Sequence, residues 1–149
     1  MKEALVLGTG ITAFPTVFVR KCRAAWEPGT VVHPGVDNLR VVGITDPAMA
    51  RTHEPVTSWN RQEEIVVPEA VAANMDKIAC ALAETRNPDE AWRSIFLKPP
   101  RKSWSDAVVA VKTNNIGRQH TRSAVMAKLC HTLTGILGVR PQNLSLIHI

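Results

Sequence analysis

The sequence predicts an α/β protein with a partial parallel, Rossmann-like sheet and covering helices. Two apolar stretches, residues 39–46 and 107–111, are rich in β-branched residues and have the length of strands. Apolar residues recur with helical spacing between these stretches and again after the second. An order of strand, helices, strand and helix typically builds a right-handed βαβ sheet. We therefore expect a truncated sheet whose next strand would begin after the last helix.

Composition favours a globular protein without a nucleic-acid partner. Hydrophobic residues make up 45% of the 149 residues and charged residues 21%, which argues against disorder. The net charge is +5, but the basic residues are scattered, and few aromatic side chains are available for base stacking. The cysteines Cys22, Cys80 and Cys130 lie far apart without a CxxC pair, so local spacing predicts no metal site.

The first 25 residues resemble an export signal. Residues 4–19 carry no charge and have basic residues on their carboxyl side, but the stretch is too short for a membrane span. The opening Met1-Lys2 is similar to the end of a twin-arginine motif. We expect an export signal remnant over residues 1–25 and a linker over residues 26–38. The protein would then be exported, periplasmic or membrane-attached, with the twin-arginine export machinery as a partner.

A competing interpretation of this segment is a dinucleotide-binding turn. Gly8, Gly10 and Ala13 fit the G-x-G-x-x-A pattern, in which glycines let the backbone approach a pyrophosphate. Pro15 delays the helix that should follow, and the next apolar run is not followed by an acid that could hold a ribose. A dinucleotide-dependent oxidoreductase therefore ranks below export.

The middle of the chain predicts a strand, a loop and two helices. The strand over residues 39–46 stops at the Asp46-Pro47 turn, and residues 48–64 have no period, which predicts a loop. A helix begins at Pro68, and Asn87 caps a second, shorter one. The apolar residues that mark these helices are Val71, Met75, Ile78, Leu82, Trp92, Ile95 and Phe96.

The last third predicts a strand, a polar loop and a helix. Residues 107–111 form a nearly continuous apolar run, which is typical of a strand buried on both faces. The polar residues 113–122 form the loop, and residues 123–137 form a helix that Gly138 and Pro141 end.

The final residues, 144–149, resemble the translation of a sequencing adapter. We therefore expect native sequence to stop near Asn143 and the chain to be a truncated metagenomic fragment. A genuine strand is the alternative, because apolar residues alternate there.

Several short motifs, in their order and spacing, resemble the family called domain of unknown function 362. They are the sequence Ala-Trp-Arg-Ser-Ile-Phe over residues 91–96, the Lys-Pro-Pro turn, the sequence Val-Ala-Val-Lys-Thr-Asn over residues 109–114, and residues 138–143 after the last helix. The similarity covers residues 39–143, which would be the N-terminal part of such a domain. It implies a twin-arginine signal, and some relatives carry iron-sulfur clusters, for which ligands could lie only in missing sequence.

Candidate binding residues follow the second predicted strand. Ligands of open parallel sheets bind beyond the carboxyl ends of the strands, and a helix amino terminus there adds positive charge. Cationic and amide side chains at that place favour a carboxylate or phosphate. The candidates are Lys112, Asn114, Asn115, Arg118, His120 and Arg122, with Asp46 from the other strand. The alternative is structural: Asn114 and Thr121 cap the turn and helix, and Arg118 and Arg122 are solvated. For Asp46 we favour the structural role of holding its Asp-Pro turn.

Two functions remain open from the sequence. One is an exported α/β protein that binds or transforms an anionic small molecule. His120 has the chemistry of a general acid or base there, but a satisfied surface histidine is the favoured interpretation. The other is a non-catalytic binding protein. Catalytic residues, cofactor and substrate stay unknown at this point.

Overall fold

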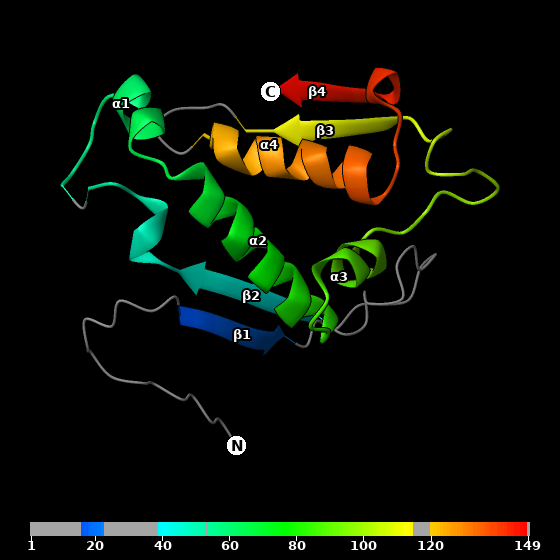
Figure 1. Cartoon of the computed structure of the whole chain (residues 1–149), viewed down its shortest axis with the longest axis horizontal. Coiled ribbons are helices and arrows are strands. Elements are labelled where there is room, and N and C mark those ends of the chain that lie inside the picture. The colour runs from blue at the N-terminus through cyan, green and yellow to red at the C-terminus, as the bar shows by residue number, and fades with distance from the viewer. Residues whose placement is uncertain (1–15, 23–38, 53, 115–119, 149) are drawn as a thin grey trace.

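The computed structural model describes residues 16–22, 39–52, 54–114 and 120–148. Two strand pairs and packed helices make up its α/β architecture (Figure 1). Strands β1 (Thr16–Cys22) and β2 (Leu39–Thr45) pair antiparallel, with Thr16 opposite Thr45. Strands β3 (Val109–Thr113) and β4 (Leu144–His148) pair in parallel, with Val109 opposite Leu144. The predicted α/β class with a partial parallel sheet and covering helices is confirmed.

The two predicted strands do not share a sheet. Helix α2 (Pro68–Ala83) contacts β2 and also contacts α4 (Ser123–His131), and the apolar cluster that follows α4 in the chain packs on β3. Strands β2 and β3 therefore lie on different sides of the helices, as Figure 1 shows, and cannot pair. The β2 strand finds its partner in β1 instead, which lies within the segment predicted as the export signal.

The predicted helix ends are confirmed by their capping groups. Helix α2 has Pro68 in its first turn, and α3 (Pro88–Ile95) is capped by the Asn87 side chain, which accepts hydrogen bonds from the backbone N–H groups of Asp89 and Glu90. Helix α4 continues as a π-helical turn (Thr132–Ile136) and stops at Gly138, whose φ of 85° favours glycine.

One helix appears where a loop was predicted. Helix α1 (Trp59–Glu64) lies inside residues 48–64, after a short 3-10 turn (Pro47–Met49) that Asp46 caps. Helix α1 contains no buried residue, so it lacks the apolar period by which helices are recognised in sequence. The loop prediction was wrong for α1, whereas the short turn agrees with the predicted Asp46-Pro47 turn.

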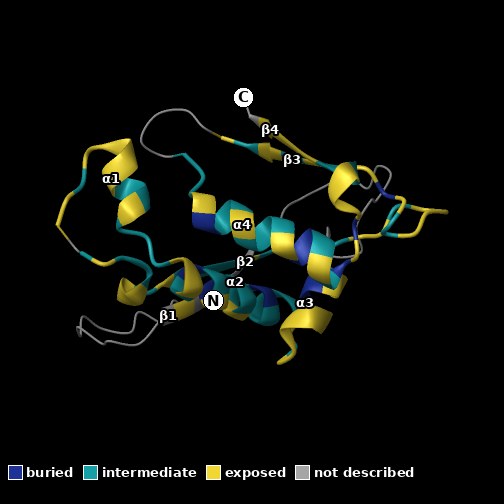
Figure 2. Cartoon of the chain, turned by 45° about the horizontal axis from the view of Figure 1, so that its top comes forward, coloured by how far each residue is buried: buried dark blue, intermediate teal, exposed yellow. Residues whose placement is uncertain are grey.

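The core consists of two apolar clusters between the helices and the parallel pair. One centres on Ala79, Ala91 and Trp92, and the other on Leu133, Leu137 and Val139. Phe96 and Ile136 pack against both clusters and join them. Figure 2 shows the buried positions on α2, α3 and the π-helical end of α4. Val71, the first apolar residue of the predicted α2 stripe, is buried as well.

The outer face of β3 is exposed. Burial alternates along the strand, with Val109 and Val111 half-buried and Ala110 and Lys112 exposed. Val108, just before the strand, is 76% exposed. The prediction of a strand buried on both faces was wrong, because within the described residues helices cover one face only.

Residues Leu144–His148 form strand β4, which agrees with the alternative interpretation of this segment as a strand. The adapter origin of these residues stays a prediction. Among the described residues, no helix combines the length and the apolar character needed to span a bilayer.

Candidate functional site

The candidate site lies where β3 ends and α4 begins. The Asn114 carbonyl accepts a hydrogen bond of 2.9 Å from the Thr121 N–H, which brings the start of α4 back to the end of β3. His120 and Arg122 are therefore held at the carboxyl end of the parallel pair, as the sequence predicted. Asn115 and Arg118, which were also predicted for this site, lie outside the described residues.

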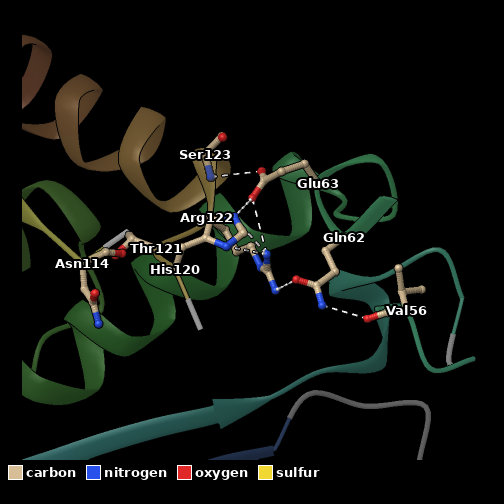
Figure 3. A network of polar contacts seen from close by, with 8 residues as sticks. All are labelled: Val56, Gln62, Glu63, Asn114, His120, Thr121, Arg122 and Ser123. Atoms are coloured by element: carbon tan, nitrogen blue, oxygen red, sulfur yellow. Dashed lines mark hydrogen bonds and ion pairs between the residues drawn. The ribbon is translucent and has the colours of Figure 1, made fainter. Parts of the chain in front are cut away.

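Helix α1 places three side chains against this segment. Trp59, Gln62 and Glu63 lie at positions i, i+3 and i+4, which share one helix face. The Trp59 ring stacks on His120 with centroids 4.7 Å apart and planes at 17°. The Gln62 Oε1 atom accepts a 2.9 Å hydrogen bond from the Arg122 guanidinium (Figure 3). The short helix is thus attached to residues far away in the sequence.

The Glu63 carboxylate is bound by three groups from residues 120–123. Its Oε1 atom lies 2.9 Å from His120 Nε2 and 3.6 Å from Arg122 Nη1. Its Oε2 atom accepts a 3.2 Å hydrogen bond from the Ser123 N–H, the first residue of α4 (Figure 3). The carboxylate therefore occupies the positive helix terminus that the sequence assigned to an anionic ligand.

The surroundings of Glu63 stabilise its charged form. Burial by itself raises the pKa of this carboxyl, but hydrogen bonds from His120 and Ser123 and the charge of Arg122 together hold the pKa below its ordinary value. Glu63 is therefore a carboxylate at neutral pH, and it offsets the charge of Arg122.

The His120 ring lies between a carboxylate and a guanidinium. A carboxylate only accepts and a guanidinium only donates hydrogen bonds. A hydrogen on His120 Nε2 is donated to Glu63 Oε1 at 2.9 Å, while Arg122 Nη1 lies 3.1 Å from Nε2 and 3.4 Å from Nδ1. With its side chain 10% exposed, the ring has both nitrogens engaged by the protein.

An open pocket of about 530 Å³ adjoins these residues. Apolar side chains and hydroxyl groups share its lining, which suits a ligand with an apolar body and a polar group. The lining residues are Trp59, Thr113, His120, Thr121, Ser123, Met126 and Leu146.

Two other candidates do not take part in this pocket. Lys112 is exposed on β3 and is not among the lining residues. Asp46 accepts hydrogen bonds from the Ala48 N–H at 2.9 Å and from the Asn74 amide at 2.6 Å, and Lys77 binds the same Asn74 side chain. The Asn74 bond foremost, then the Ala48 bond and the Lys77 charge, lowers the pKa of Asp46. The turn role predicted for Asp46 is confirmed, and its described contacts lie away from residues 120–123.

The sequence interpretation missed Glu63 and Trp59. Both lie in a stretch without apolar period, and their function depends on contacts 57 to 61 residues away. The available signal was the spacing of Trp59, Gln62 and Glu63, which places an aromatic ring and two polar groups on one face of a short helix.

Metal-binding chemistry finds no support in the part of the chain that the structure describes. No three His, Cys, Asp or Glu residues there lie close enough together to hold an ion. Cys80 and Cys130 are half-buried free thiols. Burial, and secondarily the charge of Asp76, raises the pKa of Cys80, so this thiol stays protonated at neutral pH.

No family model, curated protein or solved structure matches the chain. The chemistry of the site therefore carries the functional inference.

Proposed function

We propose that the protein binds an anionic small molecule at the amino terminus of α4. The supporting observation is that His120, Arg122 and the Ser123 N–H already bind a carboxylate, that of Glu63. Groups that hold one carboxylate in this geometry have the donors and charge to hold another, or a phosphate.

The position of the pocket supports the same ligand class. It lies at the carboxyl ends of parallel strands, where ligands of open α/β sheets bind. Hydroxyl groups of Thr121 and Ser123 can bind the acidic group, while Trp59 and Met126 contact an apolar body. A small carboxylic acid or phosphate ester with an apolar part fits this lining.

Binding without conversion fits the histidine better than catalysis does. A general base needs a ring nitrogen free to take a proton from the substrate. In His120, Nε2 faces the Glu63 carboxylate and Arg122 Nη1 lies within hydrogen-bond distance of both ring nitrogens, so neither is open to a substrate. We therefore favour the non-catalytic binding protein, and formation of a product from any bound compound would refute it.

Titration of the purified protein with small carboxylates and phosphate esters tests this function. Calorimetry should detect binding, and Arg122→Gln should weaken it at least about tenfold, because a charge-assisted contact is lost. Lys112→Gln is the matched control, since it removes an exposed cation of β3 that is not among the described contacts of Glu63. Equal weakening by both substitutions, or no binding of any such compound, would contradict the proposed site.

Membership of the domain of unknown function 362 family and export by the twin-arginine route are further proposals. They are supported by the residues alone, namely the motifs over residues 39–143 and the uncharged residues 4–19. The uninterrupted gene tests both. Paired arginines upstream of Met1 would support export to the periplasm, and cysteine clusters elsewhere in the gene would indicate an iron-sulfur cofactor.

A further inference from the structure

We propose that α1 is a displaceable lid whose Glu63 carboxylate competes with the ligand for the anion position. This inference rests on the proposed anion binding and adds its regulation. The anion position is defined here as His120 Nε2, the Arg122 guanidinium and the Ser123 N–H. In the structure it is filled from within the chain.

The anion position cannot serve two carboxylates at once. One guanidinium and one helix terminus face Glu63, and a second anion at this spot would meet a like charge within a few ångströms. A ligand anion must therefore replace the Glu63 carboxylate.

Few contacts hold helix α1 against residues 120–123. It has only six residues, none of them buried, and Trp59 is 44% exposed even while stacked. Its described side-chain contacts to residues 120–123 come from Trp59, Gln62 and Glu63. A segment held by a few polar contacts and one ring stack opens at low cost compared with the apolar core.

Departure of Glu63 also moves Trp59. The two residues lie four positions apart on one helix face, so a shift that withdraws the carboxylate unstacks the indole from His120. Because Trp59 also lines the pocket, this shift widens the pocket for the ligand. Ligand binding and loss of the Trp59–His120 stack should therefore occur together.

The test uses calorimetry with acetate and inorganic phosphate on the full chain. Glu63→Gln keeps the size of the side chain but weakens the competitor, so both anions should bind about tenfold more tightly than to the wild type. Glu64→Gln is the matched control, because Glu64 is exposed and pairs only with Arg61 among the described contacts. Its affinity should stay within about twofold of the wild type. Circular dichroism verifies that each variant folds.

A second measurement follows the wild type without disturbing the lid. The protein labelled with 5-fluorotryptophan has four tryptophans, and Trp59→Phe assigns the Trp59 resonance. Saturation with phosphate should shift this resonance. If the wild type binds phosphate with the affinity of Glu63→Gln and the resonance does not move, the lid is refuted while the anion site stands. If neither protein binds acetate or phosphate, both proposals fail.

Discussion

Asp76 on α2 connects three helices, and its replacement by Asn should destabilise the fold strongly. The Asp76 carboxylate accepts a hydrogen bond of 2.6 Å from Trp92 Nε1 on α3 and lies 2.7 Å from Lys128 Nζ on α4. The Lys128 side chain is 11% exposed and that of Asp76 26%. The substitution therefore leaves a nearly buried ammonium without its counter-charge.

The size of the effect follows from this exposure. Removal of one partner from a fully buried pair costs about 3–5 kcal/mol, and the exposed quarter of Asp76 reduces this to about 2–3 kcal/mol. The Asn oxygen still accepts from Trp92, so that hydrogen bond weakens but persists. With a urea dependence of about 2 kcal/mol/M, the unfolding midpoint should fall by about 1–1.5 M.

Urea unfolding followed by far-ultraviolet circular dichroism measures this shift. Glu64→Gln is the control, because an exposed pair should change stability by less than about 0.5 kcal/mol. Lys128→Met in the Asp76→Asn background should recover part of the loss, since it removes the stranded charge. A midpoint change for Asp76→Asn no larger than the control's would refute the role given to this carboxylate.

Three further predictions concern helix ends and pH. Asn87→Ala should cost about 1 kcal/mol in urea unfolding, because α3 loses the side chain that accepts from two of its backbone N–H groups. Gly138→Ala should also cost about 1 kcal/mol: the new methyl group meets no atom within 4 Å, so the loss would come from the backbone at φ 85° rather than from a clash. The lowered pKa of Glu63 gives stability that is fully present above its ordinary value of 4.5 and is lost as the pH falls through the lower, folded-state value. The stability difference between wild type and Glu63→Gln should therefore shrink below pH 4.5, and a difference that stays constant from pH 7 to pH 3 would contradict the assignment.

Local signals explain which parts of the fold the sequence could predict. Pro68, Asn87 and Gly138 mark helix ends through their own backbone chemistry, and the structure places helix ends beside all three. The pairing of β2 was not predictable in this way, since it depends on which side of α2 the strand lies. The same limit applies to β3, whose exposed outer face reflects what covers it and not its own residues.

In the candidate site, too, residues marked by a local pattern were predicted and residues defined by distant contacts were missed. His120 and Arg122 were predicted because they follow a strand and precede a helix, which is a local pattern. Glu63 and Trp59 were missed because their partners lie 57 to 61 residues away and α1 has no buried stripe. The sequence showed positive charge at the helix terminus but not the carboxylate that fills it.

The long sequence separation between α1 and the residues that it contacts also predicts the order in which the elements fold. Helices α2 and α3 share a cluster of residues close in sequence, and β3, α4 and β4 form a second unit of neighbouring segments. Each unit closes short loops, whereas docking of α1 closes one of about sixty residues for little apolar burial. We expect α1 to dock last, and its amide hydrogens to exchange with solvent long before those of α2 and α4.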